Sequence, residues 1–386
     1  MATRGNRRPM ASLRRDQAAP WRHIDWVLLG AVGCVAVLGL LMVFSATRGA
    51  RPPYHYSLAA KQLLFVVLGA IAGGVVALID YHHLRDWAVF IYVGAMVMLL
   101  AVLSPLGSNI KGHQGWFDLG MFQLQPSELA KVAMIVSIGA LAAQFRGELD
   151  VRRIIVLLVA AGIPIGLVLL QGDLGTTLVF VAIVPTVLWV AGARPRHLAV
   201  LAVAGIIVAT GVLTSGALHQ YQKDRFTVFL TQDSNPATSQ SQKGAGYNLD
   251  QAKITIGHGG LLGKGLFGGS QTRTGQVPEQ QTDFIFTAVG EQFGFVGTGM
   301  LLALYGLIIM RIWRTAQLAR DDFGTYVCIG VLAMLVFQIF ENSGMNMGIM
   351  PIAGIPLPFL SYGGSSTIAN FMAIGLVLNI GSRRFA

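Results

Sequence analysis

The sequence predicts an all-α polytopic membrane protein with ten transmembrane helices and a large extracytoplasmic loop between helices 7 and 8. Two observations carry this prediction. Of the 386 residues, 54% are hydrophobic and only 12% are charged, and the apolar residues gather in ten runs. A helix needs about 20 predominantly apolar residues to cross a bilayer, and each run approaches that length. The runs lie at 26–46, 62–80, 85–104, 127–144, 154–170, 174–192, 197–214, 284–310, 323–343 and 362–381.

The placement of Lys and Arg predicts the orientation of these helices. Seventeen of the 28 basic residues fall on the same side as the N-terminus, and four fall in the short loops of the other side. Because cytoplasmic loops carry the excess of Lys and Arg, we expect both termini inside and the loop 215–283 outside. The chain then divides into a basic cytoplasmic tail (1–24), one transmembrane domain (25–382) that includes this loop, and a short cytoplasmic tail (383–386).

The net charge of +10 does not indicate a nucleic-acid partner, because the basic residues are dispersed between apolar runs. The two cysteines, Cys34 and Cys328, lie inside apolar runs, where a buried free thiol is expected. No spacing of His and Cys indicates zinc. No glycine motif matches a nucleotide-binding loop in context, so no organic cofactor is expected.

Polar residues are concentrated in three segments on the expected outer side, at 105–126, 215–283 and 344–361. A transporter usually places polar groups at mid-depth and is built from repeated halves. The sequence shows no internal repeat. The pattern therefore favours an enzyme that acts on a lipid-linked substrate at the outer leaflet, and a transporter or flippase for such a lipid is the alternative.

Asp283 stands where the polar loop ends and the apolar run to about Ile312 begins. Thr282 is a suitable N-cap for that helix, and Asp283 in the first turn complements the helix dipole. An ordinary capped helix start explains both residues. Their position at the outer membrane boundary also makes Asp283 a candidate catalytic carboxylate.

Glu128 and Lys131 are three residues apart near the start of the fourth run, so they share one helix face. Pro126 fits the first position of that helix. A structural ion pair would lower the cost of burying both charges. Alternatively, the helix N-terminus and Lys131 together would bind an anion such as pyrophosphate.

Four further features carry weaker signals. Asp173 follows Gly172 in an outer turn, which turn chemistry explains. Glu341 and Glu291 lie inside apolar runs, where a carboxylate either has a function or pairs with a neighbouring helix. In the glycine-rich part of the large loop, apolar residues recur at near-helical spacing, which predicts a packed, partly amphipathic segment.

Taken together and in this order, the motifs resemble the SEDS family, the shape, elongation, division and sporulation polymerases that include RodA and FtsW. The resemblance covers about residues 25–382, and Gly344-Met345 favours the RodA branch. The matching motifs are Gln125-Pro-Ser-Glu-Leu-Ala-Lys131, Asp173-Leu-Gly-Thr176, Gly246-Tyr247 with Gln251, Ile256-Gly-His-Gly-Gly260, Gly263-Lys-Gly265, Pro278-Glu279, Thr282-Asp-Phe-Ile-Phe286 and Gly354-Ile-Pro-Leu-Pro-Phe-Leu-Ser-Tyr-Gly-Gly-Ser-Ser366.

The resemblance implies a peptidoglycan glycosyltransferase that polymerises lipid II, with a class B penicillin-binding protein and membrane lipids as further partners. It implies Asp283 as the catalytic residue. A divalent cation, Mg²⁺ or Mn²⁺, held by carboxylates is a further candidate for the site. The residues expected to bind substrate are Glu128, Lys131, Arg225, Lys264, Thr282, Ser361 and Tyr362.

The hypothesis for the reaction is an inverting glycosyl transfer. The acceptor hydroxyl attacks the anomeric carbon of a lipid-pyrophosphate donor, Asp283 accepts the proton, and cationic groups such as Lys131 and Arg225 stabilise the departing pyrophosphate. The alternatives are a flippase that performs no chemistry, an O-antigen ligase or polymerase, and a scaffold of a division or elongation complex.

Overall fold

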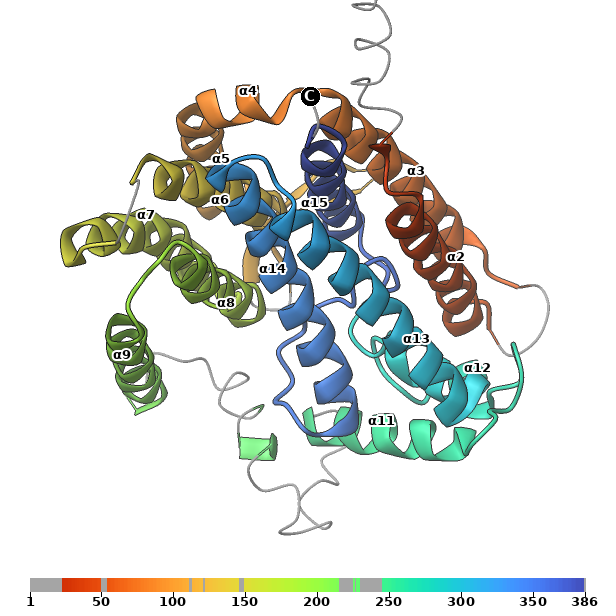
Figure 1. Ribbon diagram of the computed structural model, residues 1–386. Coiled ribbons are helices and arrows are strands. Elements are labelled where there is room, and N and C mark those ends of the chain that lie inside the picture. The colour runs from red at the N-terminus through yellow and green to blue at the C-terminus, as the bar shows by residue number, and fades with distance from the viewer. Residues whose placement is uncertain are drawn as a thin grey trace, which may run out of the picture.

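The computed structural model describes residues 23–49, 54–110, 113–120, 122–145, 149–214, 225, 227–229 and 245–384. Most of the expected tail 1–24, much of the loop 215–283 before residue 245, and the last two residues of the tail 383–386 lie outside this set. The described chain is a helical bundle whose long helices run side by side (Figure 1).

Apolar helices of different lengths overlap the predicted runs. Among the described residues, seven helices are long and apolar enough to cross a membrane, and three apolar helices are shorter. The seven are α2 (Trp26–Thr47), α3 (Ser57–Leu78), α6 (Pro126–Gln144), α7 (Val151–Leu170), α13 (Ile285–Gln317), α14 (Asp322–Met347) and α15 (Gly364–Ser382). The shorter ones are α5 (Ala88–Leu103), α8 (Leu174–Val190) and the Pro195–Ile207 part of α9 (Pro195–Thr214).

Two regions differ from the sequence prediction. The run 85–104 is not continuous, because Trp87, with φ −90° and ψ 3°, separates the short α4 (Tyr81–Asp86) from α5. The segment 105–126 is not helical. It forms an antiparallel sheet of β1 (Ser108–Ile110), β2 (His113–Asp118) and β3 (Gln123–Leu124), in that order. The prediction of an all-α protein therefore describes the bundle but not this segment, which lacks the apolar 3.6-residue period of a helix.

The interior of the bundle is formed by α6, α14 and α15, with α2 and α3 on one side and α7, α8 and α9 on the other (Figure 1). The helices α3 and α15 approach each other closely through glycines. A Cβ atom on Gly375 would collide with the carbonyl of Gly73. Small residues of this kind bring membrane helices into van der Waals contact, which is the main source of their association.

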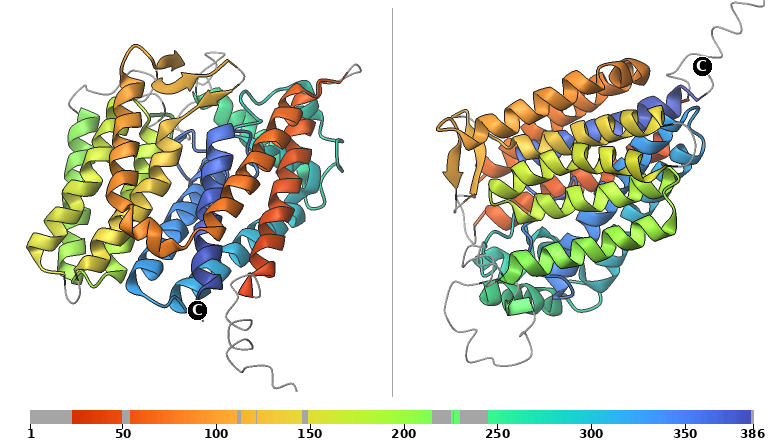
Figure 2. Two further views of the ribbon diagram at one scale, coloured as in Figure 1. Left: turned by 90° about the horizontal axis from the view of Figure 1, so that it is seen from above. Right: turned by 90° about the vertical axis from the view of Figure 1, so that its left-hand side faces the viewer.

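The two ends of the bundle carry different structures (Figure 2). One end, here called the loop end, holds the β-strands, α11 (Ala245–Gly259) and α12 (Ser270–Thr274). The opposite end, here called the tail end, holds α4 and the C-terminus. On α11, Leu249 and Ala252 are buried in a cluster with Phe284 and Met345. The predicted packed, amphipathic segment of the large loop is thus confirmed for α11.

Candidate functional site at the loop end

The chain enters α13 through a tight turn around Glu279, which has a positive φ of 53°. The Glu279 carbonyl accepts hydrogen bonds from the N–H groups of Thr282, Asp283 and Phe284. Helix α13 begins only at Ile285, and Phe284 at its N-cap makes no side-chain capping bond. The predicted N-cap at Thr282 is therefore wrong, and so is the placement of Asp283 in the first helical turn. The Thr282 hydroxyl donates to the Glu279 carbonyl at 3.1 Å instead.

The backbone of Asp283 is held by two asparagines of α14. The Asp283 carbonyl accepts a hydrogen bond from Asn342 Nδ2 at 2.8 Å and one from Asn346 Nδ2 at 3.2 Å. The Asn342 amide also donates to the Ile355 carbonyl at 2.7 Å. The last turns of α14 thus tie Asp283 to the segment that follows. Sequence analysis did not select these asparagines, although two amides one turn apart in an apolar run are the signal that would have found them.

Asp283 and Arg225 lie together beside Gly354. A Cβ atom on Gly354 would stand 3.4 Å from Asp283 Oδ2 and 3.4 Å from Arg225 Nη1, so the two charged groups are no more than twice that distance apart. Gly354 has a φ of +74°, which favours glycine, and a side chain there would also enter the space between the charges. The structure therefore brings together two of the predicted site residues, from segments about 60 residues apart.

Glu341 is a third ionisable group at this place. Its side chain in α14 is 1% exposed and lies within range of the charges of Asp283 and Arg225. The Ala353 N–H is directed toward this carboxylate, but among the described residues neither oxygen has a hydrogen bond of ordinary geometry. Buried polar atoms are nearly always paired, so an unpaired carboxylate in a helix interior requires a reason.

Glu128 and Lys131 form the predicted ion pair at the start of α6. Pro126 is the first residue of that helix, as predicted. Lys131 Nζ lies 2.9 Å from each oxygen of the Glu128 carboxylate, and the two side chains are 1% and 3% exposed. Both carboxylate oxygens contact the ammonium group and the pair is buried, so Lys131 does not present its charge to solvent in this conformation.

The turn that precedes α6 is bound to two other helices. The Gln125 amide donates to Asp173 Oδ2 at 2.9 Å, and the Gln125 N–H donates to Ser365 Oγ at 2.8 Å. The other Asp173 oxygen accepts from the Thr176 N–H and caps α8. The turn role that the sequence predicts for Asp173 is confirmed.

The glycine-rich loop around Lys264 fills a break in α13. Gly294 has φ 66° and ψ −162°, which interrupts the helix. Four backbone hydrogen bonds from the loop satisfy the groups that the break exposes: Lys264 N to Glu291 O, Gly265 N to Gln292 O, Phe295 N to Gly260 O and Val296 N to Leu261 O. A Cβ atom on Gly263 would collide with the Gln292 backbone. Lys264 thus acts here through its backbone, and its side chain is exposed.

Glu291 anchors the next part of the same loop. Its fully buried carboxylate accepts hydrogen bonds from the N–H groups of Gln271 (2.8 Å) and Thr272 (2.9 Å) and from Thr272 Oγ1 (2.7 Å). Ser270 Oγ stands 3.4 Å away. Of the two explanations left open by the sequence, Glu291 pairs with neighbouring groups, and these are donors of α12.

The segment with Ser361 and Tyr362 is fixed against the Asp283 turn. Ser361 is 2% exposed, and its hydroxyl accepts from the Leu357 N–H at 2.8 Å. The Tyr362 N–H donates to the Gln281 carbonyl at 2.8 Å. Ser361 therefore has an internal structural bond, whereas the half-buried Tyr362 lies beside the turn that carries Asp283.

Comparison with known proteins gives one consistent result. A family model described as "Cell cycle protein" (FTSW_RODA_SPOVE) matches residues 25–385. The probable peptidoglycan glycosyltransferase FtsW of Geobacter sp. (strain M18) is 32% identical over 365 residues, which cover 93% of this chain and 97% of that protein. The peptidoglycan glycosyltransferase MrdB of Escherichia coli K12 is 34% identical and covers 94% of both chains.

A solved structure shares the fold over the same length. It is described as "Structural coordination of polymerization and crosslinking by a peptidoglycan synthase complex". The matched chain is 31% identical with a TM-score of 0.78, and the match covers 94% of this chain and 98% of the other. The similarity thus includes the bundle and the loop end together.

Proposed function

Because the chain belongs to the FtsW, RodA and SpoVE family of cell cycle proteins, we propose that it is a peptidoglycan glycosyltransferase that polymerises glycan strands. It is a multi-pass membrane protein of the SEDS type. Its relatives include both an FtsW and an MrdB at similar identity, so the chain is assigned to the family as a whole. The RodA branch and a role in cell elongation remain part of the proposal, on the basis of Gly344-Met345.

One observation carries the proposed chemistry: the Asp283 carboxylate and the Arg225 guanidinium both lie next to Gly354 and therefore close to each other. In the transfer, the acceptor hydroxyl oxygen forms a bond to the anomeric carbon of the donor, and the bond from that carbon to the pyrophosphate oxygen breaks with inversion. Asp283 accepts the hydroxyl proton, which requires hydrogen-bond distance between the two groups. Arg225 stabilises the negative charge that develops on the leaving pyrophosphate.

The substrate of this proposal is lipid II, as donor and as acceptor. A lipid-linked sugar meets the protein at the membrane boundary, and Asp283 lies in the turn directly before the apolar helix α13. The half-buried Thr282 and Tyr362 flank this turn and would contact the sugar or its pyrophosphate. Lys264 would act through its exposed side chain. Glu128, Lys131 and Ser361 are buried, so they would hold the residues that contact the substrate in place and would not touch the substrate themselves.

A divalent cation, Mg²⁺ or Mn²⁺, fits this site. The described residues include no group of three or more His, Cys, Asp or Glu that could hold a metal. Mg²⁺ does not need one, because one or two carboxylates suffice when substrate phosphates and waters complete its shell. Asp283 would supply one carboxylate, and the buried Glu341 would supply the second. When bound, the cation would add positive charge for the pyrophosphate.

The proposed topology has ten spans, with α5, α8 and α9 crossing the membrane beside the seven longer helices. Both termini are cytoplasmic, and the loop end with Asp283 faces outward, which the distribution of Lys and Arg supports. The similar chain from a synthase complex that couples polymerisation to crosslinking supports a crosslinking partner. We expect that partner to be a class B penicillin-binding protein.

Asp283→Asn tests the proposal, because the amide keeps the shape of the side chain and removes the base. We expect polymerisation of purified lipid II to fall by about 10²–10⁴-fold, which is the usual contribution of a general base. The thermal midpoint should change little, since the amide has the shape of the carboxylate and the main-chain bonds from Asp283 to α14 remain. The measurement compares the polymer yield from labelled lipid II for the wild type and for Asp283→Asn, each with and without the expected partner protein.

Asp250→Asn is the matched control, because Asp250 is an exposed carboxylate on α11 at the same end. It should polymerise at the wild-type rate. If Asp283→Asn also polymerises at that rate, Asp283 is not the base. If both proteins move lipid II across liposome membranes and form no polymer, the chain is a flippase and the proposed function is wrong.

A further inference from the structure

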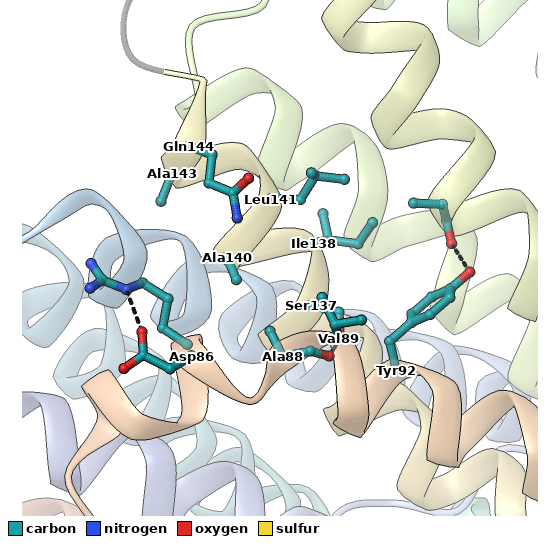
Figure 3. Close-up of a pocket in the computed structure, with 12 residues that line it drawn as sticks. Asp86, Ala88, Val89, Tyr92, Ser137, Ile138, Ala140, Leu141, Ala143 and Gln144 are labelled. Atoms are coloured by element: carbon teal, nitrogen blue, oxygen red, sulfur yellow. Dashed lines mark hydrogen bonds and ion pairs between the residues drawn. The ribbon is translucent and has the colours of Figure 1, made fainter.

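A cavity of about 490 Å³ lies at the tail end, between α5, α6 and α7 (Figure 3). It is at the opposite end of the bundle from Asp283, so the proposed glycosyl transfer does not use it. On α6 its wall extends from Ser137 to Gln144, which corresponds to about 10 Å along the helix axis at about 1.5 Å per residue. Its volume lies in the range of small-molecule sites, about 300–1,000 Å³, and is far too small for a helix of another protein.

Most of the cavity wall is apolar, and the Gln144 side chain at the end of α6 adds one amide (Figure 3). Alanines at 88, 140, 143 and 160 leave the space open. Two hydroxyls line it, and both donate to backbone carbonyls: Tyr92 Oη to Ala160 O at 2.8 Å, and Ser137 Oγ to Ala88 O at 3.1 Å and Ala133 O at 2.8 Å. The Tyr92 bond also links α5 to α7 at the inner end (Figure 3). The cavity is therefore suited to a hydrocarbon chain and not to a polar metabolite.

The surface around the cavity is apolar as well. Val89 in its wall is 69% exposed, and the neighbouring Phe90 and Val159 are 77% and 59% exposed. Large exposed apolar residues on the outer face of a membrane-spanning bundle contact lipid. A ligand can thus enter from the surrounding membrane without crossing water.

The mouth of the cavity is charged. Arg85 pairs with Asp86 at 3.7 Å, but their side chains are 44% and 64% exposed, so the pair is weak and a phosphate can compete for the guanidinium. Arg85 is therefore the cation in the cavity wall that a lipid phosphate would contact.

We propose that this cavity binds one anionic phospholipid, with an acyl chain along the alanines of α6 and the headgroup phosphate on Arg85. Basic pockets between membrane helices bind anionic headgroups, and each Lys or Arg near the surface strengthens the attraction. In the proposed topology this lipid belongs to the cytoplasmic leaflet. The inference does not depend on the glycosyltransferase activity, because the cavity and Asp283 are at opposite ends.

Native mass spectrometry of the full chain in detergent, titrated with phosphatidylglycerol and with phosphatidylcholine of the same acyl chains, tests the proposal. The wild-type protein should retain one phosphatidylglycerol in preference to phosphatidylcholine. In Arg85→Gln, the preference for phosphatidylglycerol over phosphatidylcholine should be about fivefold lower, which is the factor expected for one Arg near an anionic headgroup. Ala160→Leu fills the cavity, so its affinity for both lipids should be at least about tenfold lower than that of the wild type.

Two control variants separate a site from general lipid contact. Arg152→Gln removes an exposed cation of the same end that does not line the cavity, and Ala199→Leu enlarges an exposed alanine on α9. Both should bind as the wild type does. The proposal is overturned if Ala160→Leu retains wild-type binding with an unchanged thermal midpoint, or if Arg152→Gln lowers the preference as much as Arg85→Gln. It is also overturned if the wild type holds only lipids of mixed stoichiometry without preference.

Discussion

Two buried glutamates flank the turn that carries Asp283, and their surroundings are opposite. Glu291 in α13 accepts three short hydrogen bonds from the first residues of α12. Glu341 in α14 has the Ala353 N–H directed toward it but no hydrogen bond of ordinary geometry among the described residues, and it lies within range of the charges of Asp283 and Arg225. Both are at most 1% exposed, so burial alone does not distinguish them.

The difference indicates two reasons for placing a carboxylate inside a membrane protein. The Glu291 carboxylate accepts the N–H groups at the start of α12, which would otherwise need water as a partner. The Glu291 main-chain carbonyl also accepts from Lys264 N, in the loop that fills the break of α13. Glu341 makes no comparable set of hydrogen bonds among the described residues, and its burial costs free energy. Residues of this kind persist where they serve activity, so stability and activity should respond in opposite ways at the two positions.

Glu291→Met should have the largest effect on stability. The substitution keeps the length of the side chain but leaves the N–H groups of Gln271 and Thr272 and the Thr272 hydroxyl without an acceptor. Each unsatisfied buried donor costs about 1–3 kcal/mol, so the loss should be at least about 3 kcal/mol. The thermal midpoint and the folded yield in detergent measure it. An unchanged midpoint would show that water replaces the carboxylate and that α12 is not anchored by it.

Asn342→Ala should have an intermediate effect on stability together with a loss of activity. It removes the two hydrogen bonds that connect α14 to the carbonyls of Asp283 and Ile355, a loss of about 2 kcal/mol. Because a displacement of about 1 Å at a catalytic group can reduce a rate about 100-fold, we expect polymerisation to fall by 10–100-fold. Full activity at a temperature well below the midpoint would mean that Asn342 contributes to folding and does not position Asp283.

Glu341→Met should have the smallest effect on stability, and with the opposite sign. Replacing a buried, unpaired polar group with an apolar one of similar shape is neutral or stabilising, so the midpoint should stay or rise by the equivalent of about 1 kcal/mol. Polymerisation of lipid II should nevertheless decrease, because the second carboxylate of the proposed cation site is lost. A lowered midpoint, as for Glu291→Met, would remove the contrast between the two glutamates.

Much of the bundle could be predicted from the sequence. Apolar run length placed the ends of the long helices to within seven residues, the largest difference being the end of α13 at Gln317. A helix in lipid must be apolar over its whole membrane-facing length. The ion pair of Glu128 with Lys131 and the start of α6 at Pro126 follow from helical spacing and from the lack of an N–H in proline. These are local rules, and the structure confirms them.

The surroundings of Asp283 could not be predicted in the same way. The expected N-cap at Thr282 was wrong because the Glu279 carbonyl, in a left-handed turn, takes the N–H groups that a cap would need. The roles of Asn342 and Gly354 also depend on segments that meet only in the folded chain. The position of Asp283 at the end of the polar loop made it a candidate, and resemblance to a family added Arg225, but residue spacing gives no distance between them.

The sequence by itself determined the membrane class, the long helices and the family, since hydrophobic run length and ordered motifs are properties of the chain alone. Only the tertiary structure decided which carboxylates are paired and which are left unpaired. The physical reason is that hydrogen bonds to a buried oxygen come from donors distant in the sequence. Glu291 and Glu341 look alike along the chain, and only the helices packed against them make one an anchor and the other a candidate for chemistry.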